Sequence, residues 1–207
     1  MRFVKDVIEN TGEDVKIDWH GHNDRGFALA SSLAAIRAGV DRVHGTALGI
    51  GERCGNASMD LLLVNLKMMG IIGNDLCRLN EYCRLVSEAT HTPVPFNYPV
   101  IGPDAFRTAT GVHAAAVIKA INTGNDWLAD AVYSGIPAHM VGRKQKIEIG
   151  PLSGESNVVY WLKDHGYAMK DGVVKKIFDY AKHSNRLLTD EEIETFIETE
   201  FAESERK

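Results

Sequence analysis

The chain has 207 residues and a formal net charge of −5, so its charge balance offers no basic surface that would favour a nucleic acid as partner. Hydrophobic residues make up 44% of it, which excludes an intrinsically disordered chain. No apolar run approaches the roughly 20 residues of a membrane span, and the N-terminus lacks the apolar core of a secretory signal. Three cysteines without zinc-ribbon spacing indicate reduced thiols, so we expect a cytoplasmic protein without a membrane partner.

The first predicted elements are a short helix and a strand that leads into two histidines. Residues 3–8 carry a helical apolar stripe that should end near Thr11-Gly12, and residues 15–19 alternate as a strand does. Residues i and i+2 of a strand point to the same face, so the imidazoles of His20 and His22 should converge. Two imidazoles supply half of a divalent-metal site, which an oxygen ligand elsewhere can complete. Taken alone, the pair fits a structural role equally well.

A helix and a second short strand follow. The apolar residues of this helix recur at spacings of four, three and four: Leu29, Leu33, Ile36 and Val40. Asp24 is the expected N-cap, and Gly39 suits the left-handed position that ends a helix. With a strand over residues 41–48, these elements make a βαβ unit, whose two strands are parallel. The two histidines and the loop Gly49–Asn56 should therefore emerge at the same strand ends, where parallel folds carry their sites.

Two motifs of this region resemble the second half of the barrel in the 2-isopropylmalate synthase and homocitrate synthase family, of the DRE-TIM metallolyase superfamily. They are His20-Gly21-His22-Asn23-Asp24 and Gly49-Ile50-Gly51-Glu52-Arg53-Cys54-Gly55-Asn56-Ala57. The resemblance extends from about residue 5 to about residue 165. It implies a (β/α)₈ metalloenzyme that condenses acetyl-CoA with a 2-oxo acid.

The resemblance also implies roles for individual residues of the two motifs. His20, His22 and Asn56 should be metal ligands, and two imidazoles with oxygen ligands suit Zn²⁺ or Mn²⁺ and tolerate Mg²⁺. Glu52 and Arg53 are expected to form an ion pair that shapes the loop behind Asn56. Cys54 lies near this site, and we expect it to pack rather than to react.

The length of the chain limits how much of a barrel it can hold. A complete (β/α)₈ barrel needs about 250 residues, and only two of its βα units fit before residue 72. The expected architecture is therefore α/β, with the C-terminal part of a TIM barrel over residues 1–72 and mainly helical linker and lid subdomains over residues 73–207. The family's opening strand carries an Arg-Asp-Gly motif with a catalytic arginine and a fourth metal ligand, and this sequence has no such motif. We expect the 207-residue chain to be inactive by itself.

The rest of the chain reads as helices and connectors. The helix after Asn56 should bury one apolar stripe: Met59, Leu62, Leu63, Leu66 and Met69. A further helix should run from Asn74 or Asp75 to about Ala89. Four prolines within residues 91–103 exclude a helix and favour an extended segment along a protein surface. Helices are also expected after Gly154, over residues 173–183 and over residues 189–202, and the last should begin with a capping box of Thr189 and Glu192.

Further stretches extend the resemblance into this helical part. They are Val100–Phe106, Thr110-Gly111-Val112-His113, Ala131-Val132-Tyr133 and Val141-Gly142-Arg143. The resemblance implies that His113 and Tyr133 are catalytic residues, on a subdomain that in family dimers reaches the partner's barrel. We therefore expect a homodimer. Apolar residues should line a two-fold interface of more than roughly 1,000 Å²: Phe96, Tyr98, Phe106 and Val117.

Some positions depart from the family or lie outside its motifs. Leu48 stands where many members have Asn, and Ala114-Ala115 follow the histidine where members often have an acidic residue. These changes affect hydrogen bonding behind the site and the 2-oxo acid pocket. The remaining histidines are expected to be surface or structural residues: His44, His91, His139, His165 and His183.

The predicted activity is that of a 2-isopropylmalate synthase, an acyltransferase that condenses acetyl-CoA with 2-oxoisovalerate and releases 2-isopropylmalate and CoA for leucine biosynthesis. Homocitrate and citramalate synthases of the same family are alternatives. A metal-dependent amidohydrolase also uses His-x-His, but conventionally on the first barrel strand. A non-catalytic lid or dimerisation fragment is the alternative from a different class.

Overall fold

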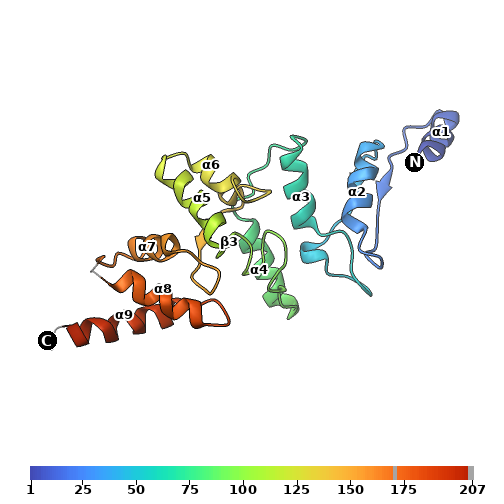
Figure 1. Ribbon diagram of the computed structural model, residues 1–207. Helices are drawn as coiled ribbons and strands as arrows, with labels where there is room; N and C mark the ends of the chain where they lie inside the picture. The colour runs from blue at the N-terminus through green and yellow to red at the C-terminus, as the bar shows by residue number, and fades with distance from the viewer. Residues whose placement is uncertain (170–171, 205–207) are drawn as a thin grey trace. The chain divides into compact units, whose positions relative to one another are not determined.

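A computed structural model describes residues 1–169 and 172–204 (Figure 1). The contacts within the chain divide it into two compact units. Unit 1 comprises Met1–Ala105 with Met140–Gly142, and unit 2 comprises Phe106–His139 with Arg143–Lys207. The fold is mixed α/β, with many helices and few strands. Nowhere in the described ranges is a helix long and apolar enough to cross a membrane.

Unit 1 opens with helix α1 (Arg2–Thr11), which ends at Gly12 in the left-handed conformation, as predicted. Strand β1 (Asp18–Trp19), helix α2 (Ala28–Arg37) and strand β2 (Arg42–Val43) follow. The strands are parallel, with Asp18 opposite Arg42, so the predicted βαβ unit is confirmed. Both strands are shorter than predicted. The β1 ladder stops at Trp19, and beyond it His22 forms an isolated antiparallel bridge with Asn56 from the loop after β2.

Helix α2 begins three residues later than predicted, with Phe27 rather than Asp24 at the N-cap. A turn closes from Gly26 N to Asn23 O at 2.8 Å, and Asn23 Oδ1 accepts a hydrogen bond from Ala28 N at 3.2 Å. The expected N-cap role of Asp24 is therefore wrong, since its carboxylate binds Arg53 instead. Gly39 has φ 81°, which confirms the predicted end of the helix.

The second half of unit 1 contains the 3₁₀ helix η1 (Ala47–Gly49), helix α3 (Met59–Met68) and helix α4 (Leu79–Thr90). Leu62 is buried as predicted, but Met69 is 47% exposed because α3 has ended before it. Helix α4 starts after Asp75, whose carboxylate accepts a hydrogen bond from Cys77 N at 2.9 Å and holds a turn there. Because α4 packs against η1, residue 72, the expected domain boundary, lies inside unit 1.

The proline-rich segment turns repeatedly from Phe96 onward, whereas residues 92–95 lie in no helix, strand or turn, so the prediction of an extended segment is wrong for its second part. Tyr98 N donates to Pro95 O at 3.0 Å, and Gly102 N donates to Tyr98 O at 2.9 Å. Proline excludes a helix, but it is well suited to turns. The hydroxyl of Tyr98 donates to Asp60 Oδ2 at 2.9 Å, so the segment packs on unit 1, as expected of a surface-lying connector.

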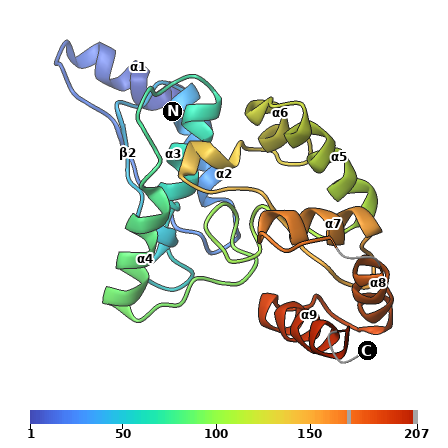
Figure 2. The same ribbon diagram turned by 90° about the vertical axis from the view of Figure 1, so that its left-hand side faces the viewer.

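Unit 2 is mostly helical. Its strands β3 (Arg107–Thr108) and β4 (Lys146–Ile147) are parallel. Its helices are α5 (Gly111–Asn122), α6 (Asp126–Ala131), α7 (Glu155–Asp164), α8 (Val173–His183) and α9 (Asp190–Ser204). The 3₁₀ helix η2 (Ala138–Val141) has residues in both units. Helices α7, α8 and α9 pack in sequence around a core that includes Trp161, Leu162 and Ile177 (Figure 2).

The C-terminal helices follow the prediction closely. Helix α8 spans the predicted residues 173–183. At the start of α9, Glu192 N donates to Thr189 Oγ1 at 3.2 Å and Thr189 N donates to Glu192 Oε2 at 2.8 Å, so the predicted capping box is confirmed.

The apolar residues expected at a dimer interface are mostly packed within their own units. Val117 is 1% exposed and Phe106 is 9% exposed, while Phe96 is 58% exposed. Val117 packs in a core cluster of unit 2, and the guanidinium of Arg143 lies over the ring of Phe106, so these two side chains are largely covered within their own unit. Phe96 is exposed and Tyr98 is partly buried. The homodimer itself stays a prediction.

Candidate metal-binding loop and the His113–Tyr133 pair

The three predicted metal ligands lie together in unit 1. The rings of His20 and His22 are 5.1 Å apart between centroids and nearly perpendicular. They follow β1 rather than lie on it. His22 forms an antiparallel bridge with Asn56, and Asn23 N donates to Gly55 O at 2.8 Å, which joins the histidine segment to the glycine-rich loop. Backbone pairing thus brings Asn56 beside the histidines across more than thirty residues of sequence.

Two ligand-type atoms in this cluster have no hydrogen-bond partner. His22 Nδ1 and Asn56 Oδ1 are both buried, and neither is bonded to any described residue. An unpaired buried acceptor is costly, and most native acceptors of this kind have a partner or bind an ion. An imidazole nitrogen and a carboxamide oxygen are both ligands that a divalent cation accepts, so these residues fit a metal ion.

The donor set is unusual in one respect. Among residues 1–169 and 172–204, no group of three or more His, Cys, Asp or Glu side chains is placed to hold a metal ion. The predicted set contains only two such residues, His20 and His22, because its third member is the amide Asn56. A fourth ligand would have to come from outside this cluster.

The glycines of the loop are required by its close packing. Asn56 N donates to Gly49 O at 2.9 Å, so the loop closes on itself. Gly55 has φ 82°, and a Cβ at that position would collide with Gly49 O. A Cβ on Gly51 would collide with the carboxamide of Asn56. The repeated glycines thus allow the tight turn and leave room for the Asn56 side chain.

Arg53 ties this loop to the segment that follows His22. Its Nε and Nη2 donate to Asp24 Oδ1 and Oδ2 at 2.7 and 3.0 Å. This hydrogen bond holds the pKa of Asp24 below its usual range. The expected pair with Glu52 is secondary, since Glu52 Oε2 lies 3.9 Å from Arg53 Nη1 and its side chain is 85% exposed. Arg53 therefore pairs mainly with Asp24, whose two oxygens each accept one of its N–H groups.

In unit 2, His113 and Tyr133 also lie together. His113 is in the first turn of α5, and Tyr133 follows α6. Their rings are stacked, with centroids 4.4 Å apart and planes 30° apart. The loop after Tyr133 is held by Asp130, whose Oδ2 accepts hydrogen bonds from His139 N at 3.0 Å and pairs with His139 Nδ1 at 2.6 Å.

The start of α5, and with it His113, is anchored by a buried amide. Asn157 is fully buried, and its Nδ2 donates to Ala109 O at 3.0 Å and to Glu148 O at 2.9 Å. Gly111 N donates to Leu152 O at 3.0 Å. A Cβ on Gly111 would meet Gly154 N at 2.7 Å, so glycine permits the close approach of the two helix starts.

A family model described as HMGL-like matches residues 1–86, the part of the chain that carries the histidines and the glycine-rich loop. These residues belong to an HMGL-like domain. The chain is 39% identical over 181 residues to the (R)-citramalate synthase of Aquifex aeolicus, covering 84% of this chain and 33% of that protein. It is 34% identical over 211 residues to the probable 2-isopropylmalate synthase of Ignicoccus hospitalis, covering 100% of this chain and 51% of that protein.

The chain thus spans about a third to a half of the length of these two relatives. Among solved structures, the N-terminal domain of a proposed aldolase from Bacteroides vulgatus superposes on 42% of this chain and 30% of its own, with 27% identity and a TM-score of 0.37. A superposition this loose carries no argument about the fold.

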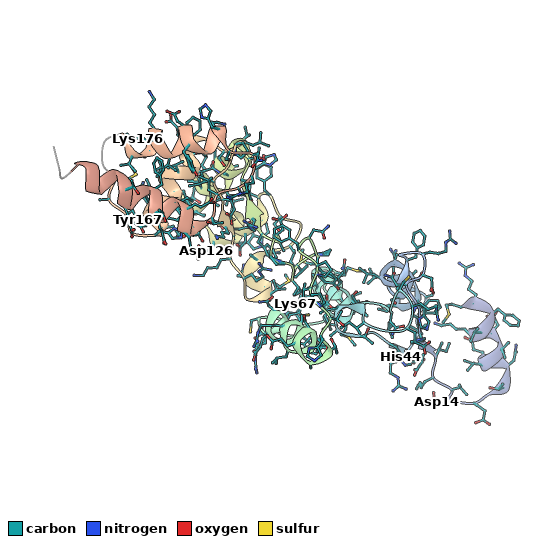
Figure 3. The ribbon with its side chains drawn as sticks, turned by 90° about the horizontal axis from the view of Figure 1, so that it is seen from below. Asp14, His44, Lys67, Asp126, Tyr167 and Lys176 are labelled. Carbon is teal, nitrogen blue, oxygen red and sulfur yellow. The ribbon has the colours of Figure 1, made fainter. Side chains whose placement is uncertain are left out.

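The HMGL-like part contains two polar residues near the histidines that sequence reasoning missed. His44, labelled in Figure 3, has its ring 5.7 Å from that of His20, and its Nε2 lies 3.3 Å from Asp18 Oδ2. Asp18 also accepts from Arg42 Nε at 3.0 Å, which lowers its pKa. The parallel register, with Asp18 opposite Arg42, could have indicated this, because it places His44 opposite His20 two residues on.

Cys54 was also misjudged. It is exposed, on the turn after Arg53, so the expectation that it packs is wrong. Arg53 adopts a left-handed φ of 56°, and the tight turn it makes carries the next residue out to solvent.

Proposed function

We propose that this chain is part of a 2-isopropylmalate synthase, an acyltransferase that condenses acetyl-CoA with 2-oxoisovalerate and releases 2-isopropylmalate and CoA in leucine biosynthesis. The observation that carries the proposal is the pair of buried, unpartnered ligand atoms, His22 Nδ1 and Asn56 Oδ1, within the HMGL-like domain. The name of the Ignicoccus hospitalis relative, a probable 2-isopropylmalate synthase, supports it, while the Aquifex aeolicus relative is named an (R)-citramalate synthase.

In this proposal His20, His22 and Asn56 hold a divalent ion, Zn²⁺ or Mn²⁺ with Mg²⁺ also tolerated. When bound, the ion supplies a Lewis acid for the carbonyl of the 2-oxo acid. The bridge between His22 and Asn56 supports this role for Asn56, and the Arg53–Asp24 pair joins the loop to the histidine segment.

His113 and Tyr133 would handle the protons of acetyl-CoA. Carbon–carbon bond formation requires loss of a proton from the acetyl methyl and a donor to the developing enolate oxygen. A neutral imidazole can accept that proton, and a phenol hydroxyl can donate to the oxygen. Because their ring centroids are 4.4 Å apart, both side chains could act on the same acetyl group.

Citramalate synthesis is the second candidate, because the Aquifex aeolicus relative carries that name at 39% identity. Citramalate has the carbon skeleton of pyruvate plus acetate, so its 2-oxo acid has a methyl where 2-oxoisovalerate has an isopropyl group. The chemistry at the metal and at the acetyl group is the same for both. The size of the pocket around the 2-oxo acid side chain decides between them.

We further propose that the working enzyme is a cytoplasmic homodimer and that these 207 residues do not turn over substrate alone. The resemblance implies an aspartate ligand and a catalytic arginine, both from an Arg-Asp-Gly motif. That motif does not occur in this sequence. A site without its cationic donor should be slower by about 10²–10³-fold.

The test is an assay of CoA release from acetyl-CoA with 2-oxoisovalerate, pyruvate or 2-oxoglutarate and Mn²⁺ or Zn²⁺. It compares the 207-residue chain with a chain extended upstream of Met1 through a complete barrel. The proposal expects turnover only in the longer chain, fastest with 2-oxoisovalerate. Fastest turnover with pyruvate would establish citramalate synthesis as the function. Equal turnover by both chains would show that the 207-residue chain has a complete site and is active alone. No turnover of any 2-oxo acid by a folded, metal-loaded longer chain would leave the non-catalytic reading.

A further inference from the structure

Asp60 is a buried carboxylate that the proposed chemistry does not use. It lies in the first turn of α3 and is 0% exposed. Burial raises the pKa of its carboxyl group. An ionisable group is kept in such a place only if its oxygens have good partners, because an unpaired buried charge is very costly. The partners of Asp60 therefore indicate what it does.

Its first partner is the backbone of the glycine-rich loop. Asp60 Oδ1 accepts a hydrogen bond from Leu48 N at 2.7 Å. Leu48 is in the left-handed conformation, with φ 56° and ψ 12°. That conformation is unfavourable for a residue with a branched, bulky side chain, so it persists only where neighbouring groups hold it. The carboxylate of Asp60 is the group that binds the amide of this strained residue.

The hydrogen bond between Asp60 and Leu48 can affect Asn56 through the next residue in the chain. The residue after Leu48 is Gly49, whose carbonyl oxygen accepts the hydrogen bond from Asn56 N at 2.9 Å. The direction of that carbonyl depends on the conformation of the Leu48–Gly49 segment. Releasing Leu48 from Asp60 would therefore turn Gly49 O and move the backbone that carries the Asn56 carboxamide.

Its second partner is the proline-rich segment. Tyr98 Oη donates to Asp60 Oδ2 at 2.9 Å, and the location of this hydroxyl raises its pKa, chiefly through burial. Each oxygen of Asp60 thus binds a different segment of unit 1: one binds the loop of residues 47–56, and the other binds the turns of residues 91–103.

We propose that Asp60 is a positioning residue that, with Tyr98, fixes the Leu48–Gly49 turn and so sets where the Asn56 carboxamide lies. Its consequence for metal binding rests on the proposed function. Asp60 bonds to Leu48 and to Tyr98, and no hydrogen bond from either residue to His20, His22 or Asn56 is found in the described part of the chain. A packing role alone would predict that stability changes while the placement of Asn56 does not.

The experiment uses the 207-residue chain and Mn²⁺ alone as probe. The variants are Asp60→Leu, Asp60→Asn and Tyr98→Phe, with Asp6→Leu and Tyr82→Phe as controls, since Asp6 and Tyr82 are exposed. The readouts are amide hydrogen exchange at Leu48 and Asn56, the side-chain amide resonances of Asn56, and the Kd for Mn²⁺.

Asp60→Leu is expected to speed exchange at Leu48 and Asn56 and to weaken Mn²⁺ binding about 10–100-fold, the usual effect of losing a group that orients a metal ligand. Asp60→Asn should keep both within about threefold of the parent, because an amide oxygen still accepts from Leu48 N. Tyr98→Phe should weaken binding by about 2–10-fold, the value of one hydrogen bond. Both controls should match the parent.

Asp60→Leu that folds and matches Asp6→Leu in exchange and in Mn²⁺ affinity would overturn the proposal. Should Asp60→Leu fail to fold, Tyr98→Phe decides it: a match with Tyr82→Phe in every readout overturns the positioning role, and a selective change supports it. If the parent binds no Mn²⁺ up to millimolar concentration, the metal site fails, while the exchange and side-chain resonances of Asn56 still decide whether Asp60 places that residue.

Discussion

Arg53 and Asp24 form a two-point ion pair that joins the glycine-rich loop to the segment after His22, with contacts of 2.7 and 3.0 Å. Both side chains are about half exposed, so the pair contributes little to overall stability. Its geometric effect is larger, because it links the two segments that hold His22 and Asn56. A change to this pair should therefore alter the position of the loop while leaving the stability of the fold nearly the same.

Arg53→Lys should show this separation. Lysine keeps the charge but loses the fork that binds both oxygens of Asp24. We expect Mn²⁺ binding to weaken by about 3–10-fold, while the free energy of unfolding in urea changes by less than about 1 kcal/mol. The measurements are a Mn²⁺ titration and urea unfolding. Arg84→Lys is the matched control, since Arg84 pairs with Glu88 on the exposed face of α4. An equal loss of Mn²⁺ affinity in both variants would contradict the prediction.

The start of α9 should be sensitive to acid. Glu192 accepts hydrogen bonds from Arg186 and from Thr189 N, which lower its pKa from 4.5 to about 2. A lowered pKa in the folded state means that this stabilisation is fully present above the ordinary glutamate pKa and is lost as pH falls from about 4.5 to about 2. The carboxyl chemical shift of Glu192 will give its pKa, and the free energy of unfolding in urea, followed against pH, will measure the loss of stability. Glu192→Gln should remove the dependence, and Glu155→Gln, at an unrelated exposed carboxylate, should not.

His91→Gly should stabilise unit 1. His91 ends α4 in the left-handed conformation, with φ 55° and ψ 28°, and it is exposed. Glycine adopts this conformation without the strain that a Cβ brings, so the change should raise stability by up to about 1 kcal/mol. In thermal unfolding, that amounts to a rise in Tm of about 2–4 °C. His183→Gly, inside the last turn of α8, should instead lower Tm, because glycine there costs helix propensity.

The elements that could be predicted from the sequence are those defined by local chemistry. The βαβ unit, the end of α2 at Gly39 and the capping box of Thr189 and Glu192 each depend on a few neighbouring residues, and all three are confirmed. The start of α2 could not be found this way, because a long-range partner, Arg53, takes Asp24 from its expected cap. Local patterns do not record competition of that kind.

The candidate site also contains residues that the sequence could predict and one that it could not. Motif resemblance singled out His22, Asn56, His113 and Tyr133, and the structure brings the first two together in unit 1 and the last two together in unit 2. The resemblance did not single out Asp60, because a carboxylate in the first turn of a helix is usually exposed to solvent and interacts with the helix dipole. Only burial and the bonds to Leu48 and Tyr98 distinguish it.

Tyr133→Phe tests the proposed proton-transfer role in the chain extended upstream through a complete barrel. The substitution keeps the ring that stacks on His113 and removes only the hydroxyl. If that hydroxyl donates to the enolate oxygen, kcat should fall about 10²–10³-fold with little change in KM. Steady-state CoA release gives both constants. Tyr180→Phe, on α8, is the control and should leave kcat unchanged. A fall confined to KM would assign Tyr133 to substrate binding rather than to proton transfer.

His22→Ala and Asn56→Ala test the metal site in the 207-residue chain. Each removes one of the two unpartnered buried ligand atoms, His22 Nδ1 or Asn56 Oδ1. If these atoms bind a cation, each variant should lose at least about tenfold in Mn²⁺ affinity. Removing a buried acceptor that has no partner should also leave the free protein as stable as before, or slightly more stable, because that acceptor was costly to bury.

The control is His183→Ala, because His183 Nδ1 lies 2.7 Å from Asp179 O of its own helix. Mn²⁺ titration and thermal unfolding without metal are to be measured for all three variants. The opposite pattern, with unchanged Mn²⁺ affinity and a large loss of stability in His22→Ala and Asn56→Ala, would mean that these side chains are structural. In that case the pairing of His22 with Asn56 would serve only to close the loop.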